Sequence, residues 1–380
     1  MDSRAVQACI DNAVRILEHN AEQFGSRFWK NSSVNNRYQE APNDDWTEGF
    51  ITGCYWLAWE ETGKELFRET ALMQVEDFLR RMQQRIKVDH HDMGFLYSLS
   101  CVAAWKLTGS ELGRDTALLA ADNLMTRFQE KGQFFQAWGE FGAKDNYRLI
   151  IDCLLNLPLL YWASEVTGNP AYRQKAEAHA RTSLANLVRP DFSTYHTFFF
   201  DPETGAPVRG VTAQGYRNDT AWARGQAWGV YGTALSYRFT RDESCIELFK
   251  HIADYFMAHL PSSGVPYWDL SFPEGSGEPW DSSASAIAAC GMLEMAKYLP
   301  EADASRYTAY ARQLAQALME KCAVKDINEA NGLLMHGVYG KSSPYNTVQD
   351  DGVDECTCWG DYFYLELLTR LKRSDWNLYW

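Results

Sequence analysis

Asp152 stands out because it is an acid inside a nearly apolar stretch, RLIIDCLLNLPLLYW at residues 148–162. Burying an ionised carboxylate is costly, so such a group is either paired or kept protonated by a raised pKa. A carboxylic acid that keeps its proton near neutral pH can serve as a general acid. We expect Asp152 about one turn into a helix, with Asn156 on the same face and Pro158 distorting the helix beyond. The alternative is a structural acid neutralised by Arg148, four residues earlier.

A second candidate acid, Asp89, opens the stretch DHHDMGF. A carboxylate facing Asp152 would give the pair of acids that glycosidases use, whereas the alternative is a helix N-cap. His90 and His91 suggest a metal at first. Consecutive helical residues point about 100° apart, and no H-x-x-x-H pair accompanies them, so we predict neither a metal nor a cofactor.

Other polar and aromatic residues suit a sugar. Arg224 and Trp228 are spaced i, i+4 in RGQAWG, where Arg could grip a carboxylate and Trp could stack on a ring; the alternative is a simple cation–π pair. Trp138 lies in a predicted loop. His196 lies among aromatic residues in SYHTFFF, where a lone histidine is more often structural.

The elements that must position these residues follow a six-fold rhythm. Three stretches place Thr-Gly after an aromatic helix end and before an amphipathic helix, at residues 62–63, 108–109 and 167–168, and weaker versions follow. Six inner helices are predicted to end near residues 62, 108, 167, 240, 300 and 369. The pattern predicts an all-α fold, an (α/α)6 barrel of six inner and six outer helices, as one catalytic domain over residues 1–380. An open helical solenoid is the alternative, but the connectors vary more than a solenoid repeat would.

If the six inner helices run in the same direction, their first residues meet at one mouth of the barrel. Helix capping accounts for acids such as Asp281 there, but not for the interleaved Trp, Arg and His. The predicted mouth is a sugar-sized cleft. It gathers Asp45, Trp46, Asp89, His90, Arg148, Asp152, Trp222, Arg224, Gln226, Trp228, Trp280, Asp281, Trp359 and Asp361.

Composition narrows the class of protein. The net charge of −14 without a basic run argues against nucleic-acid binding, and 14 Trp suit either a large core or a sugar cleft. Nine scattered Cys and the absence of a signal-like N-terminus or an apolar run of membrane-spanning length predict a reduced, cytoplasmic, soluble protein. It is expected to act as a monomer or homodimer.

Six stretches of the chain, taken in order, resemble the unsaturated glucuronyl hydrolases of glycoside hydrolase family 88. They are DHHDMGFLYSLS, RLIIDCLLNLPLLYWA, SYHTFFFDPETG, WARGQAWGVYG, DSSASAIAACG and WGDYFYLELLTR. The resemblance spans essentially the whole chain. It implies a metal-independent (α/α)6 barrel that removes Δ4,5-unsaturated glucuronic acid from lyase-generated oligosaccharides by hydrating the C4=C5 vinyl ether.

The resemblance also implies roles for particular residues. Asp152 would be the general acid and base, and Asp89 the second carboxylate. Members that favour sulfated fragments carry Ser and Lys before the final helix; here Lys341, Ser342 and Ser343 are present without a secure alignment. The residues implied to stack against the sugar or bind its polar groups are Trp46, Trp138, Trp228, His196, Gln214 and Arg224.

Three alternatives remain at this point. An unsaturated rhamnogalacturonyl hydrolase would share the barrel and the chemistry. A sugar epimerase on a similar barrel would use histidine as acid and base, which makes His196 the residue to test. A helical-repeat scaffold would have no active site and would gain no stability from a sugar.

Overall fold

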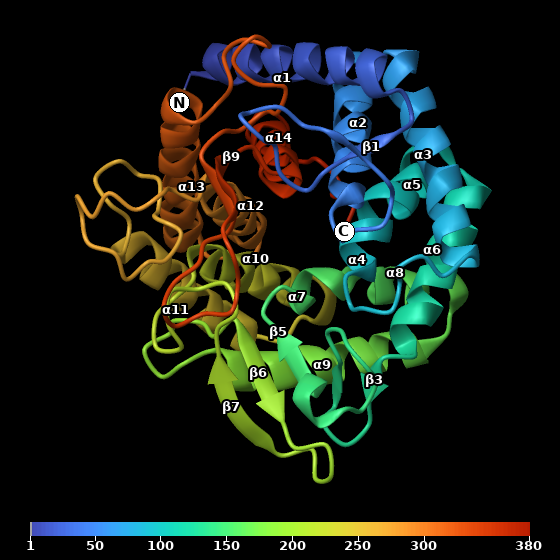
Figure 1. Ribbon diagram of the computed structural model, residues 1–380, viewed down its shortest axis with the longest axis vertical. Coiled ribbons are helices and arrows are strands. Elements are labelled where there is room, and N and C mark those ends of the chain that lie inside the picture. The colour runs from blue at the N-terminus through green and yellow to red at the C-terminus, as the bar shows by residue number, and fades with distance from the viewer. Residues whose placement is uncertain (1) are drawn as a thin grey trace.

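Two concentric rings of helices surround a common axis across residues 2–380, which this computed structural model describes (Figure 1). The inner ring contains α2 (Glu48–Thr62), α4–η1–α5 (Met93–Tyr97, Ser98–Val102, Ala103–Thr108), α7–α8 (Cys153–Asn156, Pro158–Thr167), α10 (Ala223–Thr240), α12 (Ser282–Ala296) and α14 (Cys358–Lys372). The outer ring contains α1 (Ser3–Phe24), α3 (Glu65–Gln83), α6 (Glu111–Met125), α9 (Pro170–Leu187), α11 (Ser244–Ala258) and α13 (Glu301–Lys321). This is the predicted (α/α)6 barrel.

Burial separates the two rings as the sequence pattern predicts. The inner helix α12 is buried on nearly all sides and has the small-residue sequence SSASAIAACGMLEMA. The outer helix α1 instead buries one stripe that includes Val6, Ile10 and Leu17 and exposes polar residues opposite. The inner ring is therefore covered all round, while the outer ring faces water.

The Thr-Gly pairs end three inner helices at the residues predicted. Gly63, Gly109 and Gly168 have φ of 67°, 71° and 72° and each donates its N–H to a carbonyl four residues earlier. This left-handed turn is inexpensive for glycine. Arg241 ends α10 in the same conformation with φ 59°, so the motif's geometry persists where the glycine is lost.

The third inner helix begins later than predicted. Residues Arg148–Ile150 form strand β5, and Asp152 occupies the N-cap position of α7 instead of lying one turn inside a helix. The strand pairs with β6 (Thr197–Phe200), which is distant in sequence. That long-range pairing overrides the helical preference of the apolar run.

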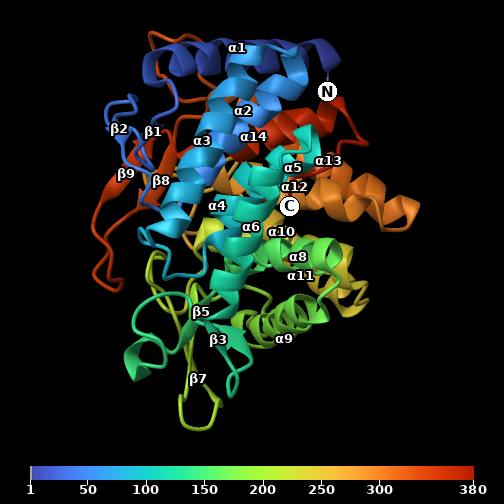
Figure 2. The same cartoon turned by 90° about the vertical axis from the view of Figure 1, so that its right-hand side faces the viewer.

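Short strands gather at the end of the barrel that faces the viewer in Figure 1 and lies on the left in Figure 2. β5, β6 and β7 (Pro207–Val211) form a three-stranded antiparallel sheet, and β8 (Gly337–Gly340) pairs with β9 (Asp351–Glu355). The other strands are β1 (Phe28–Trp29), β2 (Glu40–Ala41), β3 (Phe128–Gln129) and β4 (Phe134–Phe135), and η2 covers Lys144–Asn146. Together they build the wall around the predicted mouth.

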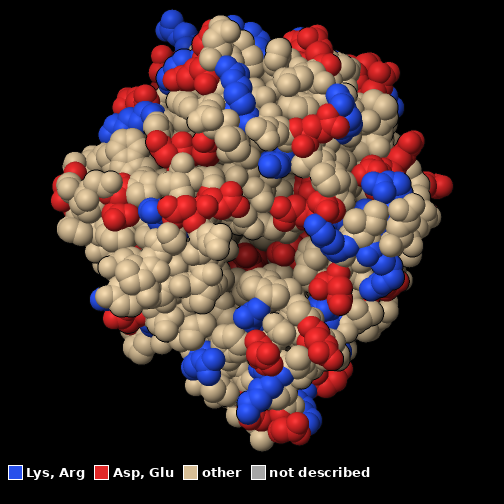
Figure 3. All heavy atoms as spheres, in the orientation of Figure 1, with Lys and Arg blue, Asp and Glu red and all other residues tan. Residues whose placement is uncertain are grey.

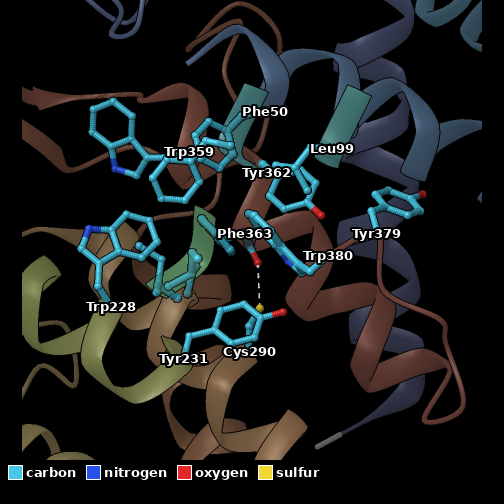
Figure 4. Close-up of a cluster of buried hydrophobic side chains, with 14 of the residues drawn as sticks. Phe50, Leu99, Trp228, Tyr231, Cys290, Trp359, Tyr362, Phe363, Tyr379 and Trp380 are labelled. Atoms are coloured by element: carbon cyan, nitrogen blue, oxygen red, sulfur yellow. Dashed lines mark hydrogen bonds between the residues drawn. The ribbon is translucent and has the colours of Figure 1, made fainter. Parts of the chain in front are cut away.

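Aromatic side chains fill the centre of the barrel (Figure 4). Trp380 is buried there and stacks on Phe363 with ring centroids 5.9 Å apart. Its indole also approaches Phe95, two residues after the start of α4. The segment after α14 therefore returns to support the inner ring from within.

The thiols lie mostly inside this packed structure. All nine cysteines are free, eight of them are buried, and Cys9 is partly exposed. Among the described residues, none of the helices combines the length and apolarity that crossing a bilayer requires.

Candidate active site

Asp152 lies where the β5–β6–β7 sheet meets the inner ring. The next residue before it, Ile151, donates its N–H to the carbonyl of His196 at 3.1 Å, which fixes the backbone. Oxygen Oδ1 of Asp152 is buried and accepts no hydrogen bond from residues 2–380. Burial, and secondly the nearby Asp92, raise the pKa of Asp152 well above its ordinary value. Asp152 thus keeps its proton to an unusually high pH for an aspartate, as a general acid requires.

The carboxylate beside Asp152 belongs to Asp92, at the N-cap position of α4. His91, Asp92 and Asp152 each have a side-chain nitrogen or oxygen atom within 4.8 Å of such an atom on the other two residues. The two helix starts can approach so closely because Gly94 has no side chain: a Cβ there would lie 2.3 Å from the Cα of Asn156. Asn156 also donates from Nδ2 to Oδ1 of Asp92 at 3.3 Å.

The two carboxyl groups differ in their affinity for protons. Burial raises the pKa of Asp92, but His91, His90 and Asn156 outweigh burial and lower it overall. Two close carboxylates resist double ionisation. One proton therefore resides on Asp152 while Asp92 is ionised, a division that would suit an acid and an electrostatic stabiliser.

Asp89 does not face Asp152, which corrects the prediction that it is the second carboxylate. Its side chain is 71% exposed and forms an ion pair with Nη1 of Arg127 at 2.5 Å. Helix α4 begins only at Met93, so the chain turns between Asp89 and Asp92 and directs the later acid inward. Asp89 is not the N-cap of α4 either.

Arg148 does not neutralise Asp152, so that alternative is wrong. No ion pair joins it to a carboxylate within residues 2–380. Its guanidinium carbon instead lies 4.5 Å from the ring centroid of Trp138 and 5.4 Å from that of Phe199. Trp138 is 36% exposed, so Arg148 covers part of an aromatic surface that remains accessible.

His196 lies in the buried wall of the site. Its Nδ1 is 2.6 Å from Oγ1 of Thr197, and its ring packs 4.9 Å from that of Trp222. Burial, followed by the charges of Arg224 and Arg148, lowers the pKa of His196 to about 3. The imidazole is neutral at physiological pH, which disfavours the epimerase alternative that needs a histidine acid.

Arg224 is buried and held from several sides. It donates to Asp281 at 2.8 Å, to Gln214 at 2.8 Å and to the carbonyls of Val338 and Tyr339. Asp281, which the sequence suggested as a simple N-cap, instead forms this buried ion pair and makes no side-chain cap bond. The structure thus brings together Arg224 and Gln214, two of the residues predicted to bind the sugar. The guanidinium of Arg224 is already paired with the carboxylate of Asp281.

The three predicted tryptophans have different environments. Trp46 is half-buried and stacks on Trp359 at 5.0 Å, and Trp138 is exposed. Trp228 is only 1% exposed and packs against Phe95 and Phe363. Figure 4 shows it among the buried aromatic side chains at the centre of the barrel. Trp228 therefore supports the site from behind and offers no face to a sugar in this structure.

The outer surface at this end is hollowed near its centre, and acidic side chains colour the floor of the hollow (Figure 3). A profile of Glycosyl Hydrolase Family 88 matches residues 20–361 of the chain. The chain belongs to glycosyl hydrolase family 88. The predicted glycosidase on an (α/α)6 barrel, and the predicted family, are confirmed.

Two family 88 relatives match nearly the whole chain. The unsaturated chondroitin disaccharide hydrolase of Streptococcus agalactiae is 48% identical over 99% of this chain and 93% of its own. The unsaturated glucuronyl hydrolase of Bacillus sp. GL1 is 46% identical over 97% of both chains. The rhamnogalacturonyl alternative is not favoured by these similarities.

Solved family 88 structures show the same barrel. The S. agalactiae glucuronyl hydrolase superposes with a TM-score of 0.95 at 46% identity, covering 100% of this chain and 94% of that one. The Bacillus enzyme gives 0.92 at 44% identity over 97% of both chains. Variants of the S. agalactiae enzyme carry asparagine in place of either of two aspartates sixty positions apart, and one such variant is complexed with ΔGlcA-GalNAc6S.

Sequence reasoning missed two residues that lie beside Asp152 in this candidate site, Asp92 and His91. Both are in DHHDMGF, and both became visible only when the start of α4 was known. The signal was the number of acids in that stretch, since either Asp could have faced inward. In the loop before α14, Lys341 and Ser342 are both bound to Asp350 and so are engaged within the protein.

Proposed function

We propose that this enzyme removes the non-reducing-end Δ4,5-unsaturated glucuronic acid from lyase-generated oligosaccharides. The observation that carries the proposal is the buried Asp152, which holds a proton within 4.8 Å of Asp92 and His91. Proton delivery to carbon needs an acid that is desolvated and ready at working pH. The names of the relatives supply the substrate class.

The proposed reaction is hydration of the vinyl ether. Asp152 gives its proton to C4, leaving positive charge shared between C5 and the ring oxygen. Asp92 stabilises that charge electrostatically, because a carboxylate at this distance in a poorly solvated site acts strongly on it. Water then adds to C5 and gives a proton back to Asp152. The hemiketal opens to a ketone, and the hemiacetal left at C1 releases the remaining sugar.

The spacing of the acids supports Asp92 as the second carboxylate. In the S. agalactiae enzyme the two aspartates replaced by asparagine are sixty positions apart. Asp92 and Asp152 have this separation, whereas Asp89 is three residues further away. We therefore assign the second carboxylate to Asp92 and not to Asp89.

The remaining residues are assigned to sugar binding and its support. Trp138, with Arg148 behind it, offers an exposed aromatic face, and Trp46 offers an edge beside Trp359. Gln214 and His196 present polar groups, and Arg224 contributes positive charge near the uronate carboxylate. We further propose that the chain works as one catalytic unit without a metal or cofactor, in the cytoplasm, as a monomer or homodimer.

Near-ultraviolet absorbance tests the function directly, because the C4=C5 bond absorbs and hydration removes it. We expect wild-type enzyme to erase the absorbance of unsaturated chondroitin or hyaluronan disaccharides, and Asp152→Asn to leave it unchanged. If the absorbance persisted with every glucuronyl substrate but disappeared with a rhamnogalacturonyl substrate, the enzyme would instead be an unsaturated rhamnogalacturonyl hydrolase.

A further inference from the structure

The imidazole of His91 lies between the two acids of the site. Its Nε2 is 3.3 Å from Oδ1 of Asp92 and 3.5 Å from Oδ1 of Asp152. The ring is 2% exposed and lies edge-on to Trp138, with centroids 6.3 Å apart. The backbone N–H of His91 donates to the carbonyl of Ala137 at 2.8 Å, which fixes the residue.

The other ring nitrogen, Nδ1, is buried and has no hydrogen-bond partner among residues 2–380. A neutral imidazole carries one proton, on either nitrogen. A proton on Nδ1 would be buried without an acceptor, whereas Nε2 lies within 3.5 Å of a carboxyl oxygen of each acid. An unpaired buried donor is costly, so the surroundings select the tautomer with hydrogen on Nε2.

We infer that His91 is a positioning residue of the reaction, whose Nε2–H lies close to both Asp92 and Asp152 and electrostatically stabilises whichever of the two is ionised. Before the reaction the donor acts chiefly on the ionised Asp92, whose Oδ1 is the nearer oxygen at 3.3 Å. Once Asp152 has given its proton to the substrate, the same donor lies within reach of the new carboxylate. This inference rests on the proposed function for its chemistry, but the tautomer follows from the geometry alone.

The same geometry argues against a metal ion held by these three residues. A histidine that ligates a metal through Nε2 carries its proton on Nδ1 and nearly always donates it to a partner. His91 offers no such partner within residues 2–380. A proton on Nε2 therefore fits the site better than a coordinate bond from that nitrogen.

Burial and the nearby cationic groups keep the imidazole of His91 neutral. Burial first, and then His90, Arg127 and Arg148, lower the pKa of His91 to about 4, against the opposing effect of Asp92. The ring is accordingly a donor near neutral pH and not a proton carrier. Besides the two acids, the titratable and charged groups that act on it are His90, Arg127, Arg148, His179 and His196.

Nitrogen-15 NMR of the histidine rings in wild-type enzyme without substrate tests the tautomer. We expect the His91 signals, assigned by their loss in His91→Leu, to report hydrogen on Nε2. Hydrogen on Nδ1, or a change of the His91 signals when a chelator is added, would overturn the inference. Neither NMR result depends on catalytic activity. A failure of the proposed function would show itself in a different experiment, in which wild-type enzyme consumes no unsaturated disaccharide.

Kinetics test the role. Without the donor the ionised forms of both acids are less stable, so in His91→Leu both limbs of the pH–rate profile should move to higher pH, by about 1 pH unit. We expect kcat to fall roughly tenfold to a hundredfold with KM little changed. His91→Gln, which places an amide N–H near the position of Nε2, should restore part of both effects.

The control is His259→Gln, an exposed change at the end of α11 that should leave the profile unchanged. A fall in kcat in His91→Leu without movement of either limb would mean that His91 only maintains packing, and the inference would be wrong. Wild-type activity in His91→Leu would equally refute it.

Discussion

Asp89 and Asp92 are three residues apart, but only Asp92 lies beside Asp152, whereas Asp89 pairs with Arg127 at the surface. Asp92→Asn removes the ionised neighbour of Asp152 and should lower kcat by on the order of 10²-fold or more. Asp89→Asn changes an exposed ion pair that contributes little, about 0–1 kcal/mol, and should retain activity. Absorbance assays on the two purified variants decide between them, and equal losses in both would contradict the assignment of Asp92.

The raised pKa of Asp152 makes the folded protein less stable as the pH increases. Its folded-state pKa exceeds the unfolded value of about 3.9. Between these two values the folded state binds more protons, so the free energy of unfolding falls as pH rises through that window. Asp152→Asn should therefore be more stable than wild type at pH 7 and equal to it near pH 3. Melting curves at the two pH values measure this, and a variant less stable than wild type at pH 7 would refute it.

At the next larger scale, the contact between α4 and α7 sets the distance between the acids. Gly94→Ala forces a Cβ against the backbone of Asn156, so the two helix starts must separate. A displacement of about 1 Å can cost on the order of 10²-fold in rate, and we expect a loss of that size, measured by kcat.

Gly63→Ala provides the matched control for that change. Gly63 ends α2 with φ of 67° and has open space around it. Alanine there should cost about 1 kcal/mol through backbone strain, yet leave kcat unchanged because α2 keeps its packing. If both glycine variants lost activity to the same extent, general destabilisation would explain the result for Gly94→Ala.

The elements also show what could be predicted from sequence. Thr-Gly pairs mark local helix ends, and the ends at Thr62, Thr108, Thr167 and Thr240 were predicted correctly. Strand β5 was not, because its partner β6 is distant in the chain and periodicity cannot separate a short apolar strand from a helix. The choice between Asp89 and Asp92 failed for a related reason: an error of three residues in a helix start turns a side chain from the site to solvent.

For the molecule as a whole, the negative net charge repels the anionic substrate that we propose. The net charge is −14, and acidic side chains lie in the floor of the hollow and in a band above it, with Lys and Arg among its other neighbours (Figure 3). An anionic disaccharide is repelled over a range that salt shortens to about 8 Å at 0.15 M. We expect kcat/KM to rise a few-fold between 0.01 and 0.15 M NaCl, and more steeply for a sulfated disaccharide.

A steady-state salt series with unsulfated and sulfated substrates measures that dependence. Potassium chloride in place of sodium chloride serves as the control, because screening depends on ionic strength and not on the cation. A rate that falls as salt rises would show instead that local cations such as Arg148 dominate the approach of the substrate.

The buried cysteine thiols can report when parts of this barrel open to solvent. Burial raises the pKa of Cys153, which follows Asp152 in the chain, to a value that leaves almost no thiolate, and does the same for Cys358 at the start of α14. Such thiols react with an alkylating reagent only when their surroundings open. Pulse alkylation followed by peptide mass spectrometry would therefore time the exposure of each cysteine-bearing segment without any engineered label. The partly exposed Cys9 would serve as the reference for immediate reaction.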